Sequence, residues 1–277
     1  MFQVYLRMRK NAFCRSFTAL IGVLVFARTP ASPALPLVLN PPFHPDRVVS
    51  STHFKVYHES FYAPAGVLNV LEGLYAKLML DLHAFVPADM EKIPLFLYKS
   101  PESYGVGTGA PLWAGAHVNL ETRTVYAYES DQFQRFLAHE MAHLFFDRFF
   151  SSETPTPLWL NEGVAMVMER DYGLKREDRA IAQQFQGMGV LPLSQFFHYS
   201  YRHVGPVGGQ EVSLWYSQAY SLTKFLMYRF SNAQFVTFCR AVRVGKSVDE
   251  ALLAGYGLQM SNTATLERLW REDLETK

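Results

Sequence analysis

The segment from His139 to Glu162 constrains this chain more than any other. It opens with His139-Glu140-Met141-Ala142-His143, an H-E-x-x-H pattern within a run from Phe133 to Phe150 that contains no glycine or proline. Such a run predicts a largely buried helix. Histidines four residues apart on a helix are about 40° apart around its axis, so both imidazoles project from one face. The pattern therefore predicts a pair of metal ligands.

A third ligand is expected on the next helix. A catalytic zinc takes three protein ligands and keeps one position open for water. Residues 151–157 have the composition of a turn, and a second helix is expected from Leu158. Glu162 lies near its start, with eighteen residues between it and His143, so an antiparallel hairpin would return its carboxylate to the histidines. Glu140 can reach a water at the open position and is the expected general base.

The two motifs together resemble those of the gluzincins, zinc metallopeptidases whose third ligand is a glutamate on the following helix. The sequence Trp159-Leu160-Asn161-Glu162-Gly163 is most similar to the corresponding motif of aminopeptidase-type gluzincins and of the smaller peptidase MA-like domains. The resemblance implies Zn²⁺ held by His139, His143 and Glu162. Glu169 also matches an acidic residue that commonly follows in that helix.

A tyrosine pair on a later segment extends the resemblance. Residues 215–221 are similar to a tyrosine-containing stretch of peptidase MA-like domains, and aminopeptidase-type gluzincins stabilise the oxyanion with a tyrosine hydroxyl. Tyr216 and Tyr220 are four residues apart and share a helix face. The resemblance implies Tyr216 as this donor, with Tyr220 second. Packing against the central helices explains both tyrosines equally well.

Residues around the ligands bear on their orientation. Ligating histidines usually donate their second N–H to a carboxylate or carbonyl. Asn161 matches a gluzincin position that can orient a histidine, and Asp147, one turn after His143, is a second candidate. Met166 stands where thermolysin-like sequences place an aspartate, which argues against close kinship with thermolysin.

The resemblance favours an endopeptidase. Aminopeptidases carry a Gly-x-Met-Glu-Asn segment that captures the substrate amino group, whereas residues 115–119 read Gly-Ala-His-Val-Asn and lack the acid. Two other classes stay open. One is a zinc hydrolase acting on an amide of the cell envelope, and the other is a non-catalytic binding or scaffold protein with a structural zinc.

The pattern of the chain predicts an α+β fold with a small N-terminal sheet, a central H-E-x-x-H helix and a helical C-terminal lobe, and the resemblance implies that these form a zincin-like two-lobed domain. The helix of the motif is expected to have Ser130 or Asp131 as its N-cap. Residues 100–103 are expected to form a turn followed by a short helix or loop, and glycines 105, 107 and 109 are expected to mark a flexible loop. The expected strands are 53–58, 93–98, 113–119 and 124–128, and the other helices 65–85, 158–170, 176–187, 210–230, 232–243, 247–255 and 262–275.

One of the strands before the motif helix could bind substrate. In gluzincins an edge strand there pairs with the substrate main chain, and an exposed edge offers unpaired N–H and C=O groups to an extended peptide. His117, on the 113–119 strand, could line the same cleft. The expected partner is therefore a protein or peptide substrate.

The N-terminal region suggests export. Basic residues precede an apolar run at 17–27, which is about as long as the core of a signal peptide and shorter than a membrane span. We therefore expect a signal peptide or signal anchor at 1–35, a proline-rich linker at 36–47 and the catalytic domain at 48–277. The protein is expected in the periplasm or outside the cell, or anchored by residues 17–27. A formal charge of +1 gives no indication of nucleic-acid binding.

Overall fold

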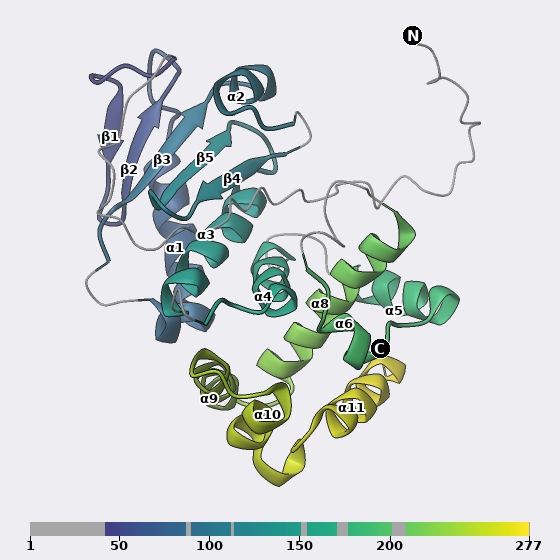
Figure 1. Cartoon of the computed structure of the whole chain (residues 1–277). Coiled ribbons are helices and arrows are strands. Elements are labelled where there is room, and N and C mark those ends of the chain that lie inside the picture. Colours follow the sequence, from purple (N-terminus) through teal and green to yellow (C-terminus); the bar gives the residue numbers. More distant parts are fainter. Residues whose placement is uncertain are drawn as a thin grey trace, which may run out of the picture.

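The computed structural model describes residues 42–86, 90–111, 114–150, 154–170, 177–200 and 209–276. The expected signal segment and residues 36–41 of the expected linker lie outside these residues. The described chain is a mixed α+β structure with one small sheet and many helices (Figure 1), as predicted. The strands are β1 Val48–Ser50, β2 Phe54–His58, β3 Ile93–Tyr98, β4 Ala116–Asn119 and β5 Thr124–Tyr128. The helices are α1 Val67–Leu82, η1 His83–Phe85, α2 Pro101–Thr108, α3 Phe133–Phe149, α4 Leu158–Arg170, α5 Glu177–Met188, α6 Leu193–Phe196, α8 Gln210–Tyr228, α9 Asn232–Arg243, α10 Val248–Tyr256, η2 Gly257–Gln259 and α11 Thr263–Glu275.

The sheet has the strand order β1-β2-β3-β5-β4. Strands β2, β3 and β5 are parallel to one another, whereas the edge strands β1 and β4 pair antiparallel with β2 and β5. The connection between β4 and β5 is a tight hairpin in which His117 faces Tyr126. Strand β4 is therefore an edge strand, and its partner β5 leads into the helix with the H-E-x-x-H motif.

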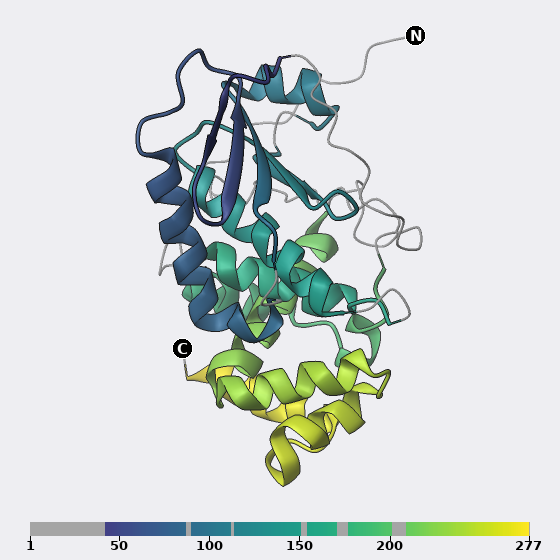
Figure 2. The same ribbon diagram turned by 90° about the vertical axis from the view of Figure 1, so that its left-hand side faces the viewer.

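The alternation of side chains along the strands gives the sheet two covered faces. In β3, Leu95 and Leu97 point into the main core with residues of α1 and α3. Phe96 and Tyr98 point to the opposite face, where they pack with Tyr104 of α2. Period-two alternation places neighbouring residues on opposite faces. The sheet is thus a layer with α1 and α3 on one side (Figure 2).

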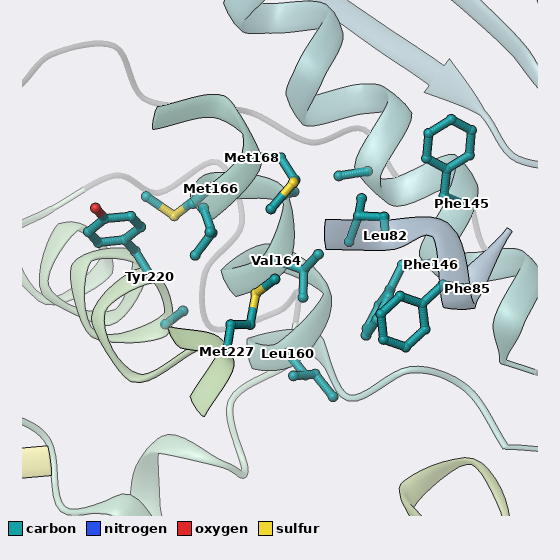
Figure 3. Packing of buried hydrophobic residues seen from close by; sticks show 14 of the residues in the cluster. Leu82, Phe85, Phe145, Phe146, Leu160, Val164, Met166, Met168, Tyr220 and Met227 are labelled. Atoms are coloured by element: carbon teal, nitrogen blue, oxygen red, sulfur yellow. The ribbon is translucent and has the colours of Figure 1, made fainter. Parts of the chain in front are cut away.

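Helix α4 lies between α3 and α8 and is almost entirely buried. Figure 3 shows Val164 and Met168 of α4 with Phe146 of α3 and Phe85 on one side, and Tyr220 of α8 on the other. Gly163 permits this approach, because a Cβ there would lie 2.1 Å from the Thr223 Oγ1 of α8. Helices α9 to α11 complete the C-terminal part (Figure 1).

The structure corrects two sequence expectations. Glycines 105 and 107 lie within helix α2, with Gly109 as its C-cap, so the segment is not a flexible loop. Ser100 caps this helix by accepting the N–H of Ser103, and Pro101 occupies its first turn. The N-cap of α3 is Gln132, without a side-chain bond, so both Ser130 and Asp131 were wrong. A search of the described helices for one long and apolar enough to cross a membrane gives none.

Candidate active site

Helix α3 places the two histidines of the motif side by side. His139 and His143 are both buried, and their Nε2 atoms are 3.1 Å apart. With a proton on each Nδ1, both Nε2 atoms carry lone pairs when the rings are neutral. Two lone pairs at this distance repel each other unless a proton or a metal cation lies between them. The pair is thus arranged to share a cation.

Helix α4 brings a carboxylate to the same point. Glu162 is fully buried, and its Oε2 lies 3.9 Å from the Nε2 atoms of both His139 and His143. A point equidistant from these three atoms would lie about 2.1 Å from each, which matches zinc–ligand distances of about 2.0–2.2 Å. The donor set is two imidazole nitrogens and one carboxylate oxygen, all within 4.8 Å of one another. Both its chemistry and its spacing fit zinc.

Each histidine is oriented by a bond from its other nitrogen. The Nδ1–H of His139 donates to Glu169 Oε2 at 3.1 Å, and that of His143 donates to Asn161 Oδ1 at 3.1 Å. Carboxylate and amide oxygens accept here, which fixes the tautomers and leaves both Nε2 atoms for a metal. The sequence suggested Asn161 and Asp147 as residues that orient a ligand histidine, and in the structure Asn161 accepts the hydrogen bond from His143.

Glu169 is held in turn by a residue that sequence reasoning missed. Arg135, one turn before His139 on α3, donates its Nε–H to Glu169 Oε1 at 2.6 Å. The sequence could have indicated the position of Glu169, because this residue follows Glu162 by two helical turns and so lies on the same helix face. An arginine in the first turn of a helix gives no comparable signal.

The acidic side chains of the site are buried. Glu140, Glu162 and Glu169 are 6%, 0% and 1% exposed. Burial opposes the charged form of His139, but the bond to Glu169 and the nearby carboxylates outweigh it and raise the pKa of His139 to about 9. Burial, together with the neighbouring His139, lowers the pKa of His143 to about 3. A cluster of buried carboxylates is stabilised by a cation, and a divalent metal can supply that charge.

Glu140 follows His139 and lies against the edge strand. The backbone N–H of Val118, in β4, donates to its carboxylate. Burial, the largest effect, raises the pKa of Glu140 to about 7 even though this bond favours the charged form. A carboxylate with a pKa near neutrality suits proton transfer in both directions.

The two tyrosines and His117 contact residues other than the three metal-ligand candidates. Tyr220 is 4% exposed, accepts a bond from Lys224 Nζ at 3.0 Å and has Arg170 over its ring at 4.3 Å. Tyr216 is partly buried and packs against Trp215. His117 stacks on Tyr126 and bonds Tyr104 Oη at 2.7 Å, on the sheet face opposite α3. These contacts place His117 on the other side of the sheet from the histidine pair.

These features define a candidate zinc-hydrolase centre built on one helical hairpin. A model described as the peptidase MA superfamily matches residues 110–276, which is more than half of the chain and spans β4 through α11. The chain belongs to the peptidase MA superfamily, which confirms the resemblance to peptidase MA-like domains. No curated protein matches the chain.

Proposed function

We propose that this protein is a gluzincin-type zinc metallopeptidase that cleaves peptide bonds within exported protein or peptide substrates. The observation that carries the proposal is the convergence of His139, His143 and Glu162, whose donor atoms lie within 4.8 Å of one another. When bound there, zinc would supply a Lewis acid and a water of lowered pKa. The membership of a peptidase superfamily supports the same reading.

Glu140 is the proposed general base. It would accept a proton from the attacking water and pass it to the leaving amine. Its burial and its bond from the Val118 N–H support the role, because they fix the carboxylate beside the histidine pair. A purely structural zinc site needs no such group.

The edge strand β4 is the proposed binding site for the substrate main chain. It pairs with β5 on one side only, so its other side can accept an extended peptide as a further strand. The contact between Val118 and Glu140 would place that peptide beside the base. An open edge of this kind accepts internal segments, which favours endopeptidase action.

The oxyanion donor is proposed to be Tyr216. Its side chain is only partly buried, whereas that of Tyr220 is nearly inaccessible. We further propose two lobes, with the sheet and α1 to α3 on one side of the site and the helices from α4 onward on the other. Export, by a signal at 1–35 that is cleaved or kept as an anchor, belongs to the same proposal.

The test combines metal content with cleavage of an unfolded protein substrate. The wild-type chain should bind about one zinc and lose cleavage with a chelator. Glu162→Ala should lose the metal, while Glu140→Gln should keep it and cleave about 10²- to 10⁴-fold more slowly. A wild-type chain without zinc would refute the proposal.

The same measurements separate the alternatives. Zinc without protein cleavage, combined with hydrolysis of an amide-linked envelope peptide, would indicate the envelope hydrolase. Zinc with full biological function in Glu140→Gln would indicate the binding or scaffold role.

A further inference from the structure

A chain of three side chains runs from the edge of the molecule to the candidate metal. Arg135 Nε–H donates to Glu169 Oε1 at 2.6 Å, and Glu169 Oε2 accepts from His139 Nδ1 at 3.1 Å. The side chain of Arg135 is 24% exposed, that of Glu169 1% and that of His139 3%. The two oxygens of one carboxylate thus connect a partly solvated guanidinium to a buried ligand.

The ion pair between Arg135 and Glu169 stabilises the buried carboxylate and orients it. A buried carboxylate is costly unless it is paired and hydrogen-bonded. Arg135 binds one oxygen, so the carboxylate is fixed in rotation and its second oxygen stays directed at His139. Arg170 also adds positive charge near Glu169, but its guanidinium lies over the ring of Tyr220 at 4.3 Å. The direct hydrogen bond from Arg135 is the contact that fixes the orientation of the Glu169 carboxylate.

The two histidines are supported differently. His139 donates to a carboxylate paired with an arginine, whereas His143 donates to the neutral amide of Asn161. A charged acceptor raises the basicity of a ligating imidazole more than a neutral one. Changes at Arg135 should consequently reach the metal through His139 alone.

We propose that Arg135 is a positioning residue of the metal centre, which strengthens zinc binding by holding Glu169 against His139. This inference rests on the proposed zinc site. Mutations of such outer partners typically weaken metal binding by about 10- to 100-fold. Arg135→Gln should therefore bind zinc about tenfold or more weakly than the wild type.

The experiment is a double-mutant cycle on zinc affinity, measured with the full chain by competition against a chromogenic chelator. The variants are Arg135→Gln, Glu169→Gln and the double variant. Arg135→Gln should weaken binding in the wild-type background and have little further effect once Glu169 is glutamine. Arg268→Gln, which breaks an exposed pair with Glu272 on α11, is the matched control and should bind as the wild type does.

A conservative variant separates loss of the guanidinium contact from loss of folding. Arg135→Lys keeps the positive charge but not the planar guanidinium, so its affinity should lie between those of the wild type and Arg135→Gln. Equal zinc affinity in wild type and Arg135→Gln would overturn the inference while leaving the zinc site intact. Independent, additive losses would also overturn it. A wild-type chain that binds no zinc would instead remove the proposed function itself.

Discussion

The backbone N–H of Val118 donates to the carboxylate of Glu140. This contact ties the edge strand β4 to the helix that carries both histidines. The relative placement of strand and helix therefore decides where a strand-bound peptide would lie with respect to the proposed base. A second close contact, between Gly115 and Phe136, governs the same placement.

Replacing Gly115 with alanine should displace β4. A Cβ at Gly115 would lie 1.9 Å from Cδ2 of Phe136, so strand or ring must move. Overpacking of this kind costs about 1–3 kcal/mol. We expect a lower midpoint of thermal unfolding and a reduced rate of cleavage, with zinc affinity unchanged because the ligands lie on α3 and α4.

The double variant Gly115→Ala/Phe136→Ala provides the control. Removal of the ring opens the space that the new methyl group needs, so cleavage should recover part of its rate although the core loses an aromatic side chain. Full activity of Gly115→Ala alone would show that the strand position is not critical.

Replacing Gly163 with alanine should disturb the metal ligand beside it. The new Cβ would lie 2.1 Å from Thr223 Oγ1 and 2.6 Å from the Ala219 carbonyl oxygen, both in α8. Helix α4 must then move, and Glu162 moves with it. We expect a loss of stability of about 1–3 kcal/mol together with weaker zinc binding, measured by urea unfolding and chelator competition.

Gly73→Ala is the matched control for this prediction. Gly73 lies within α1, and a Cβ there meets nothing within 4 Å. Alanine is favoured over glycine in a helix by about 0.5–1 kcal/mol. This variant should be slightly more stable and bind zinc as the wild type does. Equal stability losses in both variants would contradict the close-contact argument.

The sequence predicted the elements that local pattern determines. Strand β3 and helix α4 have the expected bounds, because an apolar run and a preceding proline mark them. For helix α2 the sequence left a short helix or a loop open and assigned Gly105 and Gly107 to a flexible loop, since glycine disfavours a helix. Its cap at Ser100 and the burial of Tyr104 against the sheet stabilise it instead. Tertiary packing of this kind has no local signature.

In the site, too, the sequence predicted what local pattern determines and missed what tertiary packing determines. The spacing of His139, His143 and Glu162 predicted that their side chains would meet, because helix periodicity and a short turn bring them together. The contact between Arg135 and Glu169 depends on how α3 crosses α4. That crossing follows from side-chain packing along both helices, which spacing alone does not supply.

Glu59 should make stability depend on pH. Its Oε2 accepts from the Lys99 N–H at 3.1 Å and from Ser103 Oγ. Burial opposes the charge, but these bonds and the Lys99 ammonium hold the pKa of Glu59 below its usual 4.5. The stabilisation is therefore fully present above pH 4.5 and is lost as the pH falls through the lower, folded-state value.

Urea unfolding of the wild type and Glu59→Gln at several pH values checks this. At pH 7 the variant should be less stable by about 1.5–3 kcal/mol, as expected for hydrogen bonds to a charged group. The difference should shrink at pH values below the ordinary pKa of a glutamate. A difference that does not vary with pH would show that the charge of Glu59 is not involved.

The two tyrosines of α8 should respond differently to loss of their hydroxyl groups. Tyr216→Phe should lower kcat by about 10²- to 10³-fold, the usual effect of removing an oxyanion donor, with zinc affinity and stability nearly unchanged. Tyr220→Phe removes a buried acceptor of the Lys224 ammonium. It should cost about 1–3 kcal/mol of stability and leave kcat within a few fold of the wild type.

Both variants are measured by steady-state cleavage and thermal unfolding, with zinc content as a check on the site. The pairing of the two is informative because the residues share one helix face but differ in burial, with Tyr220 only 4% exposed. A large loss of kcat in Tyr220→Phe, with Tyr216→Phe near the wild type, would reverse the proposed roles. It would also mean that the Lys224 ammonium polarises the catalytic hydroxyl, since a lysine donor leaves the phenolic proton free to reach the oxyanion.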